Sequence, residues 1–236
     1  MHNLSMLWQE DIKDQSVLTN EQVQDCAFRI TCREIPVDHA WDLREEILNV
    51  LPWLTDEPQA AIHSIHSASS ANGWIRPSLD SGNLIQLSRR TRLYLRLPIR
   101  RIDDAKVLIG KELLIAGCSI LINETGQHRL FPSSTLFTRS MDANQVKDEQ
   151  AFEDHVIHLL SKIGVVPKKI LCGLAHEISC NDHNIPARSV LLADLEPHES
   201  IRIQESGLGS NGLLGCGIFL PHKSLNAVNT TSSMSD

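Results

Sequence analysis

The sequence predicts an α+β fold in which one order of elements, β-α-β-β-α-β, occurs twice along the chain. Three observations support this prediction. Short alternating segments rich in strand formers lie between segments with apolar residues at helical spacing. The order of these segments in the first half recurs in the second half. The 236 residues suffice for one large domain or two small ones.

The first unit is expected over residues 23–133. Its elements, in order, are a strand over 26–34, a helix after an N-cap at Asp38, strands over 60–68 and 84–98, a helix over 102–110 and a strand over 118–124. Pro36 ends the first strand because proline lacks the N–H that a sheet ladder needs. Asp38 can accept a hydrogen bond from the first helical turn. Gly110 suits the position just after a helix.

The second unit is expected over residues 134–225, and polar tails are expected at 1–22 and 226–236. Its elements, in order, are a strand over 135–141, an amphipathic helix that ends at Gly164, strands over 168–180 and 187–195, a helix over 197–206 and a strand over 214–221. Pro197 begins this last helix and Gly207 follows it, which is the usual asymmetry of helix ends. Two such units form the tandem ferredoxin-like arrangement, in which two helices cover one face of a four-stranded antiparallel sheet.

The composition is that of an ordinary soluble protein. Hydrophobic residues make up 42% of the chain, yet no apolar run approaches the roughly 20 residues of a membrane-spanning helix. The first residues lack the basic and apolar segments of a secretion signal, so a cytoplasmic protein without a membrane partner is expected. The six cysteines include no C-x-x-C pair, so we expect reduced thiols, no structural metal and no cofactor.

The distribution of charge bears on nucleic-acid binding. The formal net charge of −7 argues against it, because phosphate binding usually shows as a basic excess. Six arginines nevertheless lie within the thirteen residues from Arg89 to Arg101. Such a concentration allows a local basic surface on an acidic protein.

The segment ESGLGSNGLLGCGIFLPHK, residues 205–223, is unusually rich in glycine. Its G-x-G-x-x-G match is not a dinucleotide fingerprint, because a helix precedes it and a strand follows, the reverse of the required order. Two interpretations remain: a flexible turn, or a backbone cradle whose N–H groups bind phosphate. Two matched pairs with five residues between them favour the cradle: Gly207 and Gly209, then Gly215 and Gly217.

This glycine pattern, placed between the last helix and the last strand of such a chain, resembles the C-terminal signature of the RAMP superfamily of CRISPR-associated proteins. It is similar in particular to the endoribonuclease that cuts CRISPR precursor RNA within its repeats. The segments that resemble its type I MYXAN branch are CREIPVDHAWDL, LPWLTDEP, NGWIRP, LSRRTRLYLRLP, KKILCG and LGCGIFLPHK. The resemblance extends from Cys26 to Lys223.

The resemblance implies metal-independent cleavage by the RNA's own 2′-hydroxyl, which leaves a 2′,3′-cyclic phosphate and a 5′-hydroxyl. It implies CRISPR repeat RNA as the partner, with the glycine-rich loop packed beside it, and other subunits of an effector complex as further partners. Two alternatives remain open. The chain can instead be a non-catalytic RNA-binding subunit of such a complex, or an enzyme acting on small molecules, which would need a cavity with convergent polar groups.

Cleavage of this kind requires a base, an acid and donors that stabilise the charged transition state. The resemblance places the general base at His39, which by position alone is an exposed residue at a helix start that can reach out over the sheet edge. His63 and His66 lie three apart on a predicted strand and point to opposite faces, which argues against a shared metal. His66, nearer the loop with Asn72 and Trp74, is the candidate acid or orienting partner.

No lysine lies on the helix of His39, where Arg44 is the only cation, so the identity of the acid stays open. The other histidines, His176 among them, give no reason to prefer a function.

The arginines follow strand geometry. On a strand of period two, one face carries Arg90, Arg92, Tyr94 and Arg96, and the leucines lie on the other. This face suits phosphate contacts and base stacking, although a merely solvated strand face has the same pattern. Arg90 is the candidate for stabilising the transition state. The remaining candidate RNA contacts are Arg89, Lys168, Lys169, Arg188, Lys223 and the four paired glycines, Gly207, Gly209, Gly215 and Gly217.

Overall fold

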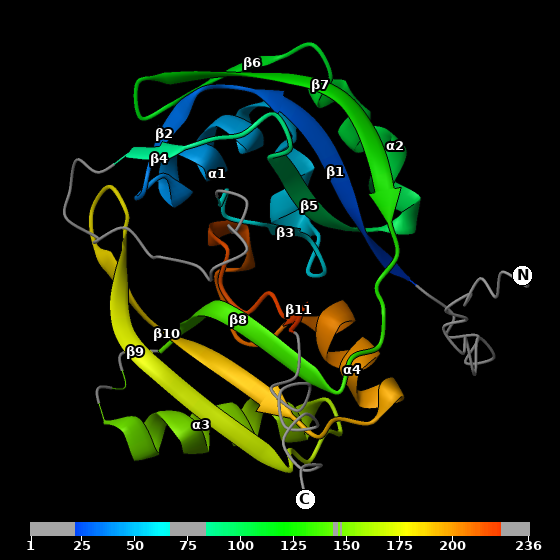
Figure 1. The fold of residues 1–236 in the computed structure, drawn as a ribbon, viewed down its shortest axis with the longest axis vertical. Coiled ribbons are helices and arrows are strands. Elements are labelled where there is room, and N and C mark those ends of the chain that lie inside the picture. The colour runs from blue at the N-terminus through cyan, green and yellow to red at the C-terminus, as the bar shows by residue number, and fades with distance from the viewer. Residues whose placement is uncertain (1–21, 67–83, 144–145, 147, 223–236) are drawn as a thin grey trace, which may run out of the picture.

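The computed structural model describes residues 22–66, 84–143, 146 and 148–222. Two curled antiparallel sheets lie on opposite sides of the molecule, and the segment before the last strand runs between them (Figure 1). The five-stranded sheet with its helices is termed the N-terminal lobe, and the four-stranded sheet with its helices the C-terminal lobe. In the part of the chain that the structure describes, no helix is long and apolar enough to cross a membrane.

The N-terminal lobe has the strand order β3-β5-β1-β7-β6, with antiparallel neighbours throughout. Its strands are β1 (Val23–Thr31), β3 (Ala61–Ile62), β5 (Arg92–Pro98), β6 (Glu112–Ile115) and β7 (Cys118–His128). Its helices are α1 (Ala40–Val50) and the short α2 (Ile102–Ala105), flanked by the 3-10 turns η1 (Pro52–Asp56), η2 (Ile99–Arg101) and η3 (Lys106–Leu108). A separate two-stranded sheet pairs β2 (Glu34–Pro36) with β4 (Leu84–Gln86).

The C-terminal lobe has the order β11-β8-β10-β9, again antiparallel. Its elements are β8 (Thr135–Asp142), α3 (Glu149–Lys162), β9 (Lys169–Ser179), β10 (Asn184–Ala193), α4 (Pro197–Ser206), η4 (Gly212–Leu214) and β11 (Leu220–Pro221). In the N-terminal lobe β1 lies between β5 and β7, with β3 beyond β5, and in the C-terminal lobe β8 lies in the same way between β10 and β11, with β9 beyond β10. The predicted tandem ferredoxin-like α+β fold is confirmed, while the limits 23–133 and 134–225 stay a prediction.

Several predicted elements of the N-terminal lobe differ from the observed ones. The strand expected over 26–34 ends at Thr31 and Glu34 belongs to β2, the helix expected over 102–110 is reduced to α2 and η3, and the prediction contains no counterpart of β6. The strand expected over 84–98 is divided, because β4 pairs with β2 whereas β5 joins the main sheet. Arg89 and Arg90 lie in the turn between them. The strand expected over 60–68 is reduced to the two residues of β3.

Two details at the edges of the lobes also differ from the prediction. The N-cap of α1 is His39 rather than Asp38, and its side chain makes no capping hydrogen bond. The strand expected over 214–221 is reduced to β11. Gly215 and Gly217 have φ angles of 83° and 67°, which a β-strand does not use.

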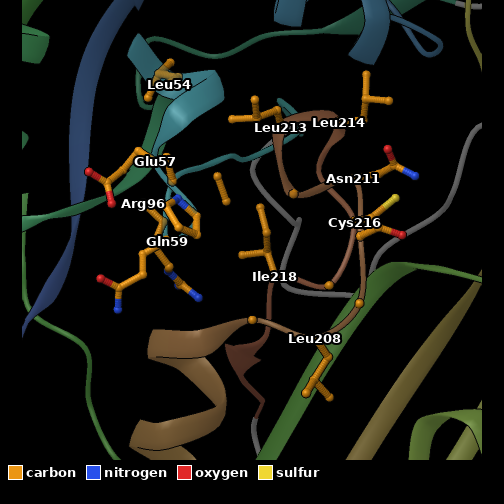
Figure 2. A pocket seen from close by; sticks show the side chains of 18 of the residues that line it. Leu54, Glu57, Gln59, Arg96, Leu208, Asn211, Leu213, Leu214, Cys216 and Ile218 are labelled. Carbon is orange, nitrogen blue, oxygen red and sulfur yellow. The ribbon is translucent and has the colours of Figure 1, made fainter. Parts of the chain in front are cut away.

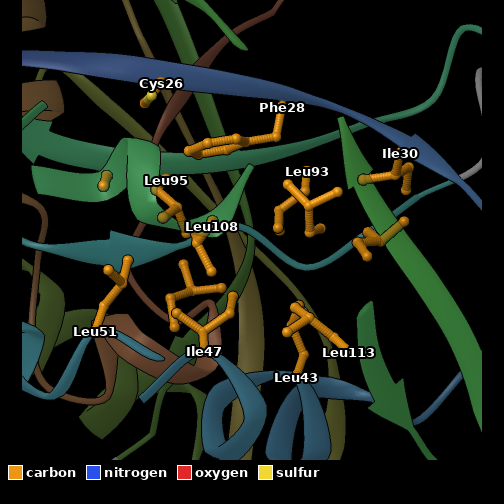
Figure 3. Close-up of a cluster of buried hydrophobic side chains, with 14 of the residues drawn as sticks. Cys26, Phe28, Ile30, Leu43, Ile47, Leu51, Leu93, Leu95, Leu108 and Leu113 are labelled. Carbon is orange, nitrogen blue, oxygen red and sulfur yellow. The ribbon is translucent and has the colours of Figure 1, made fainter. Parts of the chain in front are cut away.

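Each lobe has its own apolar core under its helices. Leu43 and Ile47 lie four residues apart on α1 and therefore on one face, which packs onto Phe28 and Leu93 of the sheet (Figure 3). In the C-terminal lobe the same spacing buries one face of α3. That face carries Phe152, Val156 and Leu160.

A third buried cluster joins the lobes and is termed the apolar junction. Its buried members come from the β9–β10 hairpin and from the segment before β11, and α1 packs against them. They are Ile178, Ile185, Ala187, Leu214 and Cys216, with Ala40 and Trp41 on the side of α1. The relative position of the two lobes is therefore fixed in part by ordinary core packing.

Candidate functional site

A cavity of about 170 Å³ lies between the lobes. The N-terminal lobe contributes the residues that lead into α1, the segment after β3, and β4, and the C-terminal lobe contributes β8, β9 and β10. Its polar lining includes His39, His66, His176, Arg139, Ser64, Ser140 and Ser189. Titratable side chains from both lobes therefore meet here. It is termed the histidine cavity.

His39 is almost fully buried, with 3% of its surface exposed. Its Nε2 accepts a hydrogen bond from the backbone amide of Ile65 at 2.9 Å. Its Nδ1 therefore carries the proton and donates it to the carbonyl oxygens of Pro36 at 2.7 Å and Val37 at 3.1 Å. Burial lowers the pKa of His39, because it penalises the charged imidazole. The expectation of an exposed ring that reaches over the sheet edge is wrong.

His66 and His176 line the same cavity from different lobes. The Nε2 atom of His176, on β9, lies 2.9 Å from Oγ of Ser140 on β8. His66 is half-buried just after β3. The sequence pattern pointed to His66 but gave no signal for His176, because the packing of one lobe on the other leaves no motif or period. The loop expected around Asn72 and Trp74 lies outside the described residues.

The residues of the predicted arginine face become more buried along the chain, from Arg89 and Arg90 to Arg96. Arg89 and Arg90 are exposed in the turn before β5, and they are not among the described residues that line the histidine cavity. Arg92 is half-buried and donates to the carbonyl of Arg89 at 3.1 Å. The ring of Tyr94 lies between the imidazoles of His63 and His128, with centroid distances of 5.8 and 6.0 Å. A stacking role for Tyr94 would have to use a ring that already has neighbours.

Arg96 is not part of an exposed surface. It is 2% exposed, and its guanidinium bonds to Asp25 and to two backbone carbonyls of the C-terminal lobe. This burial contradicts the prediction of Arg96 as a phosphate contact. The prediction failed because the pattern of a single strand does not show that another lobe covers one of its faces.

The other predicted RNA contacts with a positive charge are Lys168, Lys169, Arg188 and Lys223. The first three lie in ion pairs within the C-terminal lobe. Lys168 pairs with Glu196 and Lys169 with Asp194, both at 2.8 Å on the surface. Such pairs contribute about 0–1 kcal/mol, so phosphate could replace the carboxylates at little cost. Arg188 lies over the ring of Phe152 on α3 at 5.8 Å. Lys223 lies outside the described residues.

The glycine-rich loop, residues 207–219, folds back on itself. All four predicted glycines have positive φ angles: 62° at Gly207, 80° at Gly209, 83° at Gly215 and 67° at Gly217. The amide of Leu208 donates to the carbonyl of Gly217 at 3.1 Å, and the amide of Gly217 donates to Ser140 of β8 at 2.8 Å. A Cβ atom at Gly217 would lie 1.9 Å from the carbonyl oxygen of Leu208.

The backbone conformation of the loop therefore explains why glycine occupies these four paired positions. They permit left-handed backbone and close approach between the two halves of the loop. The amides of Gly207, Gly215 and Gly217 all donate to backbone carbonyls, so these three are not free to cradle a phosphate in this conformation. The structure also argues against a loose turn, because the loop bonds to β8 and packs on the N-terminal lobe.

A second cavity, of about 350 Å³, lies between part of the glycine-rich loop and the N-terminal lobe. Figure 2 shows Arg96, Glu57 and Gln59 on one side of it and the loop on the other. The loop is tied to β8 here, because Asp142 accepts hydrogen bonds from Ser210 at 2.6 Å and from Asn211 at 2.8 Å. The cavity is bounded by cations and carboxylates together, so it has no single sign of charge.

Within the described ranges, no group of three or more His, Cys, Asp or Glu side chains is arranged to hold a metal ion. The prediction of a reaction without metal remains untested by this arrangement. The histidine cavity offers imidazoles, hydroxyls and a guanidinium, and its lining also includes Asp38 and Glu177. Imidazoles and carboxylates can transfer protons, and the guanidinium can stabilise negative charge.

The fold and this cavity define a tandem ferredoxin-like protein with a histidine-lined site between its lobes. A family model described as Cas6 Crispr matches residues 24–224, and the chain belongs to that family. The chain is also 27% identical, over 197 residues, to the CRISPR-associated endonuclease Cas6 of Myxococcus xanthus. That match covers 84% of this chain and 80% of the relative.

Solved structures of low identity share the fold. A Cas6-related protein from Pyrococcus furiosus matches with a TM-score of 0.56 at 14% identity, over 84% of this chain and 98% of that one. A structure described as CRISPR associated protein Cas6 matches with a TM-score of 0.59 at 9% identity, over 86% and 100%. An RAMP protein described as binding different RNA substrates matches with a TM-score of 0.57 at 16% identity, over 84% and 98%.

Proposed function

We propose that this protein is an endoribonuclease that cuts CRISPR precursor RNA within its repeats without a metal ion. The observation that carries the proposal is the convergence of His39, His66 and His176 in one cavity between the lobes. Membership of the Cas6 family and the relative named as a CRISPR-associated endonuclease support a nuclease, and the RAMP protein described as binding different RNA substrates supports the choice of RNA. Repeat RNA is the binding partner of this protein. Subunits of an effector complex are further partners, which the cleaved RNA can bind.

The proposed reaction is an internal transesterification. The 2′-oxygen attacks the adjacent phosphorus while the bond from phosphorus to the 5′-oxygen breaks, which leaves a 2′,3′-cyclic phosphate and a 5′-hydroxyl. A base takes the proton of the 2′-hydroxyl, and an acid gives a proton to the departing 5′-oxygen. A cation next to the phosphate stabilises the charge that builds up in the transition state.

His39 has the tautomer of a base. Its protonated Nδ1 is held by two carbonyls, so its Nε2 lone pair is the one that can receive a proton. The lowered pKa keeps the ring neutral near pH 7. The amide of Ile65 occupies the position that the 2′-hydroxyl would need, so RNA has to displace this amide. His66 is the next residue after Ile65. The displacement of the Ile65 amide would therefore also move His66, the proposed general acid.

Two arginines compete for the transition-state charge. Arg139 lines the histidine cavity, whereas Arg90 is exposed in the turn before β5 and has to be brought to the phosphate by RNA binding. We favour Arg139 for charge stabilisation. Arg89, Arg90 and Arg92 fit contacts along the RNA backbone outside the cavity.

A non-catalytic RNA-binding subunit is the second candidate function. The observation that favours it is the geometry of His39, whose two ring nitrogens are both bonded to the backbone. A protein that binds repeat RNA tightly without cutting it would match this arrangement. Binding and cleavage therefore have to be measured separately.

The deciding experiment incubates the protein with repeat RNA in EDTA and analyses the product ends. We expect cleavage, with a 2′,3′-cyclic phosphate, and its loss when the 2′-hydroxyl at the cut site is replaced by hydrogen. His39→Ala should lower the cleavage rate by about a hundredfold or more with RNA affinity retained. His158→Ala, on the exposed face of α3, is the matched control and should cleave at the wild-type rate. Tight binding without cutting by the wild-type protein would favour the second candidate.

A further inference from the structure

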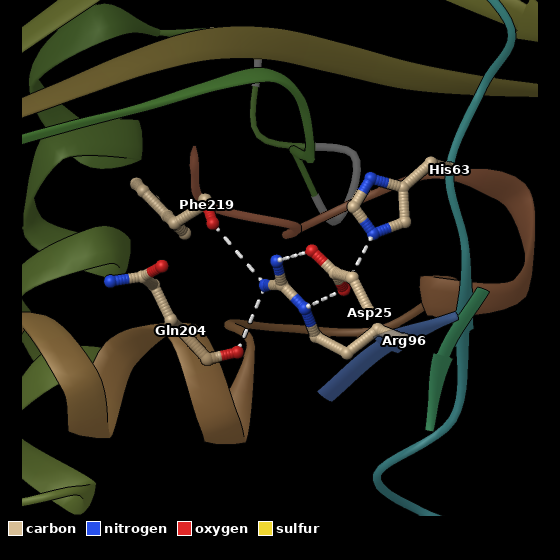
Figure 4. A network of polar contacts seen from close by, with 5 residues as sticks. All are labelled: Asp25, His63, Arg96, Gln204 and Phe219. Atoms are coloured by element: carbon tan, nitrogen blue, oxygen red, sulfur yellow. Dashed lines mark hydrogen bonds and ion pairs between the residues drawn. The ribbon is translucent and has the colours of Figure 1, made fainter. Parts of the chain in front are cut away.

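Arg96 spans the gap between the lobes. Its Nε donates to Oδ1 of Asp25 at 2.9 Å and its Nη2 to Oδ2 at 3.0 Å, a two-pronged pair within the N-terminal sheet. Its Nη1 reaches the C-terminal lobe and donates to the carbonyl oxygens of Gln204 at 2.9 Å and Phe219 at 3.2 Å (Figure 4). Nε2 of His63 lies 3.2 Å from Oδ1 of Asp25 and completes the network.

The two carbonyls lie at the two ends of the glycine-rich loop. Gln204 belongs to the last turn of α4, where carbonyls lack partners within the helix and carry partial negative charge. Phe219 is the last residue before β11. One guanidinium nitrogen therefore ties the entry of the loop to its exit, and the rest of the side chain ties both to β1.

The network is connected to both walls of the histidine cavity. On one wall, His63 lies two residues before Ile65, whose amide bonds to Nε2 of His39. On the other wall, the loop bonds to Ser140 through the amide of Gly217, and Ser140 bonds to His176. Each connection consists of hydrogen bonds joined by one or two residues of backbone, so a shift of the latch residues can be transmitted to both walls through a short physical path.

We propose that Arg96 and Asp25, with His63, form a latch that holds the glycine-rich loop and sets the two walls of the histidine cavity against each other. The latch deepens the proposed function and rests on it for the consequence for cleavage. Arg96 is a positioning residue in this scheme, because it acts through the loop and through the segment after β3. The period of two along the strand of Arg96 predicts an RNA contact at the same residue, which its burial contradicts.

The chemistry of the residue pair suits such a latch. Burial alone would raise the pKa of Asp25, but His63 and Arg96 together hold it well below its ordinary value, so the carboxylate is ionised. A guanidinium has a rigid fork that can satisfy a carboxylate and backbone carbonyls at once. A buried pair contributes little net stability because desolvation offsets the attraction, and directional specificity is its better attested use.

The test compares Arg96→Gln and Asp25→Asn with Arg29→Gln, a control whose arginine pairs with Glu124 on the surface of the same sheet. Amide hydrogen exchange of the full chain is measured over residues 207–219 and 61–66. Single-turnover cleavage and RNA affinity are measured in parallel. We expect exchange in these two segments to rise by about tenfold or more in both latch variants. The cleavage rate should fall by about tenfold to a hundredfold while affinity changes little, because a small misplacement of groups affects the reaction more than binding.

The two readouts separate the latch from the proposed function. Unchanged exchange in the two segments would overturn the latch, whatever happens to cleavage. Loosened segments with undiminished cleavage would overturn its link to the reaction. If Arg96→Gln does not fold, Asp25→Asn keeps the shape of the side chain and decides on the same measurements. A wild-type protein that does not cut RNA would overturn the proposed function alone, because exchange still reports on the latch.

Discussion

Two of the junctions between the lobes, the apolar junction and the latch, differ in chemistry. The apolar junction packs the β9–β10 hairpin and Leu214 onto α1, and its buried residues are removed from water. The latch instead places one carboxylate and one guanidinium in the interior, each with named partners at fixed distances. Both junctions use the glycine-rich loop, which supplies Leu214 to the first and Phe219 to the second.

This difference in chemistry suggests that the apolar junction mainly determines how strongly the lobes bind each other, whereas the latch mainly determines their relative position. Apolar burial stabilises by area and has no direction, so the apolar junction tolerates small shifts. Hydrogen bonds to a charged fork weaken steeply with distance and angle, so the latch does not. We expect changes in the apolar junction to lower the free energy of unfolding, and changes in the latch to act mainly on geometry.

The largest effect is expected at Gly217, where the loop serves both junctions. A Cβ here would lie 1.9 Å from the backbone oxygen of Leu208, at a φ angle of 67° that side chains rarely adopt. Gly217→Ala should lower the free energy of unfolding by about 3 kcal/mol or more, because backbone has to move. Chemical denaturation measures this change.

Gly110→Ala provides the control for that substitution. Gly110 has a similar φ angle of 82°, but a Cβ there would meet nothing within 4 Å. Its cost should be about 1–2 kcal/mol, from the backbone conformation alone. Equal losses in the two variants would mean that the close contact with Leu208 contributes nothing, and that the loop relaxes freely.

The next effect tests the apolar junction by itself. Leu214 is 5% exposed between the hairpin and α1. Leu214→Ala should lower the free energy of unfolding by about 2–4 kcal/mol through lost burial and a residual cavity. Leu174→Ala, at a position on β9 that is 85% exposed, should change it by less than about 0.5 kcal/mol. Similar values for both variants would show that the junction is not a packed core.

The fold was predictable because its signals are local. Apolar spacing along α3, Pro197 at the first position of α4 and Gly207 after its end all belong to single elements, and each appears as expected. The histidine cavity itself was not predictable: family resemblance selects His39, and the position of His66 near the loop with Asn72 and Trp74 selects His66. Its third imidazole, His176, arrives from the other lobe and has no signal in the pattern of its own strand.

The arginine segment explains why the rest could not be predicted. Period two correctly places Arg92 and Arg96 on one face of β5, but it is silent on what covers that face. The C-terminal lobe covers the end with Arg96 and leaves the end near Arg90 in solvent. Burial by a second lobe depends on residues far away in the sequence. Arginines at equivalent positions of one strand pattern, such as Arg90 and Arg96, can therefore differ completely in exposure.

The smallest expected effect concerns the latch and pH. The folded-state pKa of Asp25 lies below the value of about 3.9 for an unfolded chain, so its ionised form stabilises the fold above that pH. This contribution is lost as the pH falls from about 5 towards the folded-state pKa, with a slope of at most about 1.4 kcal/mol per pH unit.

Asp25→Asn should therefore flatten the dependence of the unfolding free energy on pH between about 5 and 3. Denaturation at a series of pH values measures it, and Asp104→Asn, in a surface pair with Arg101, should keep the wild-type slope. An unchanged slope in Asp25→Asn would mean that the carboxylate is not held by His63 and Arg96 in solution. The latch would then lose its charged centre, and the placement of the lobes would depend mainly on apolar packing.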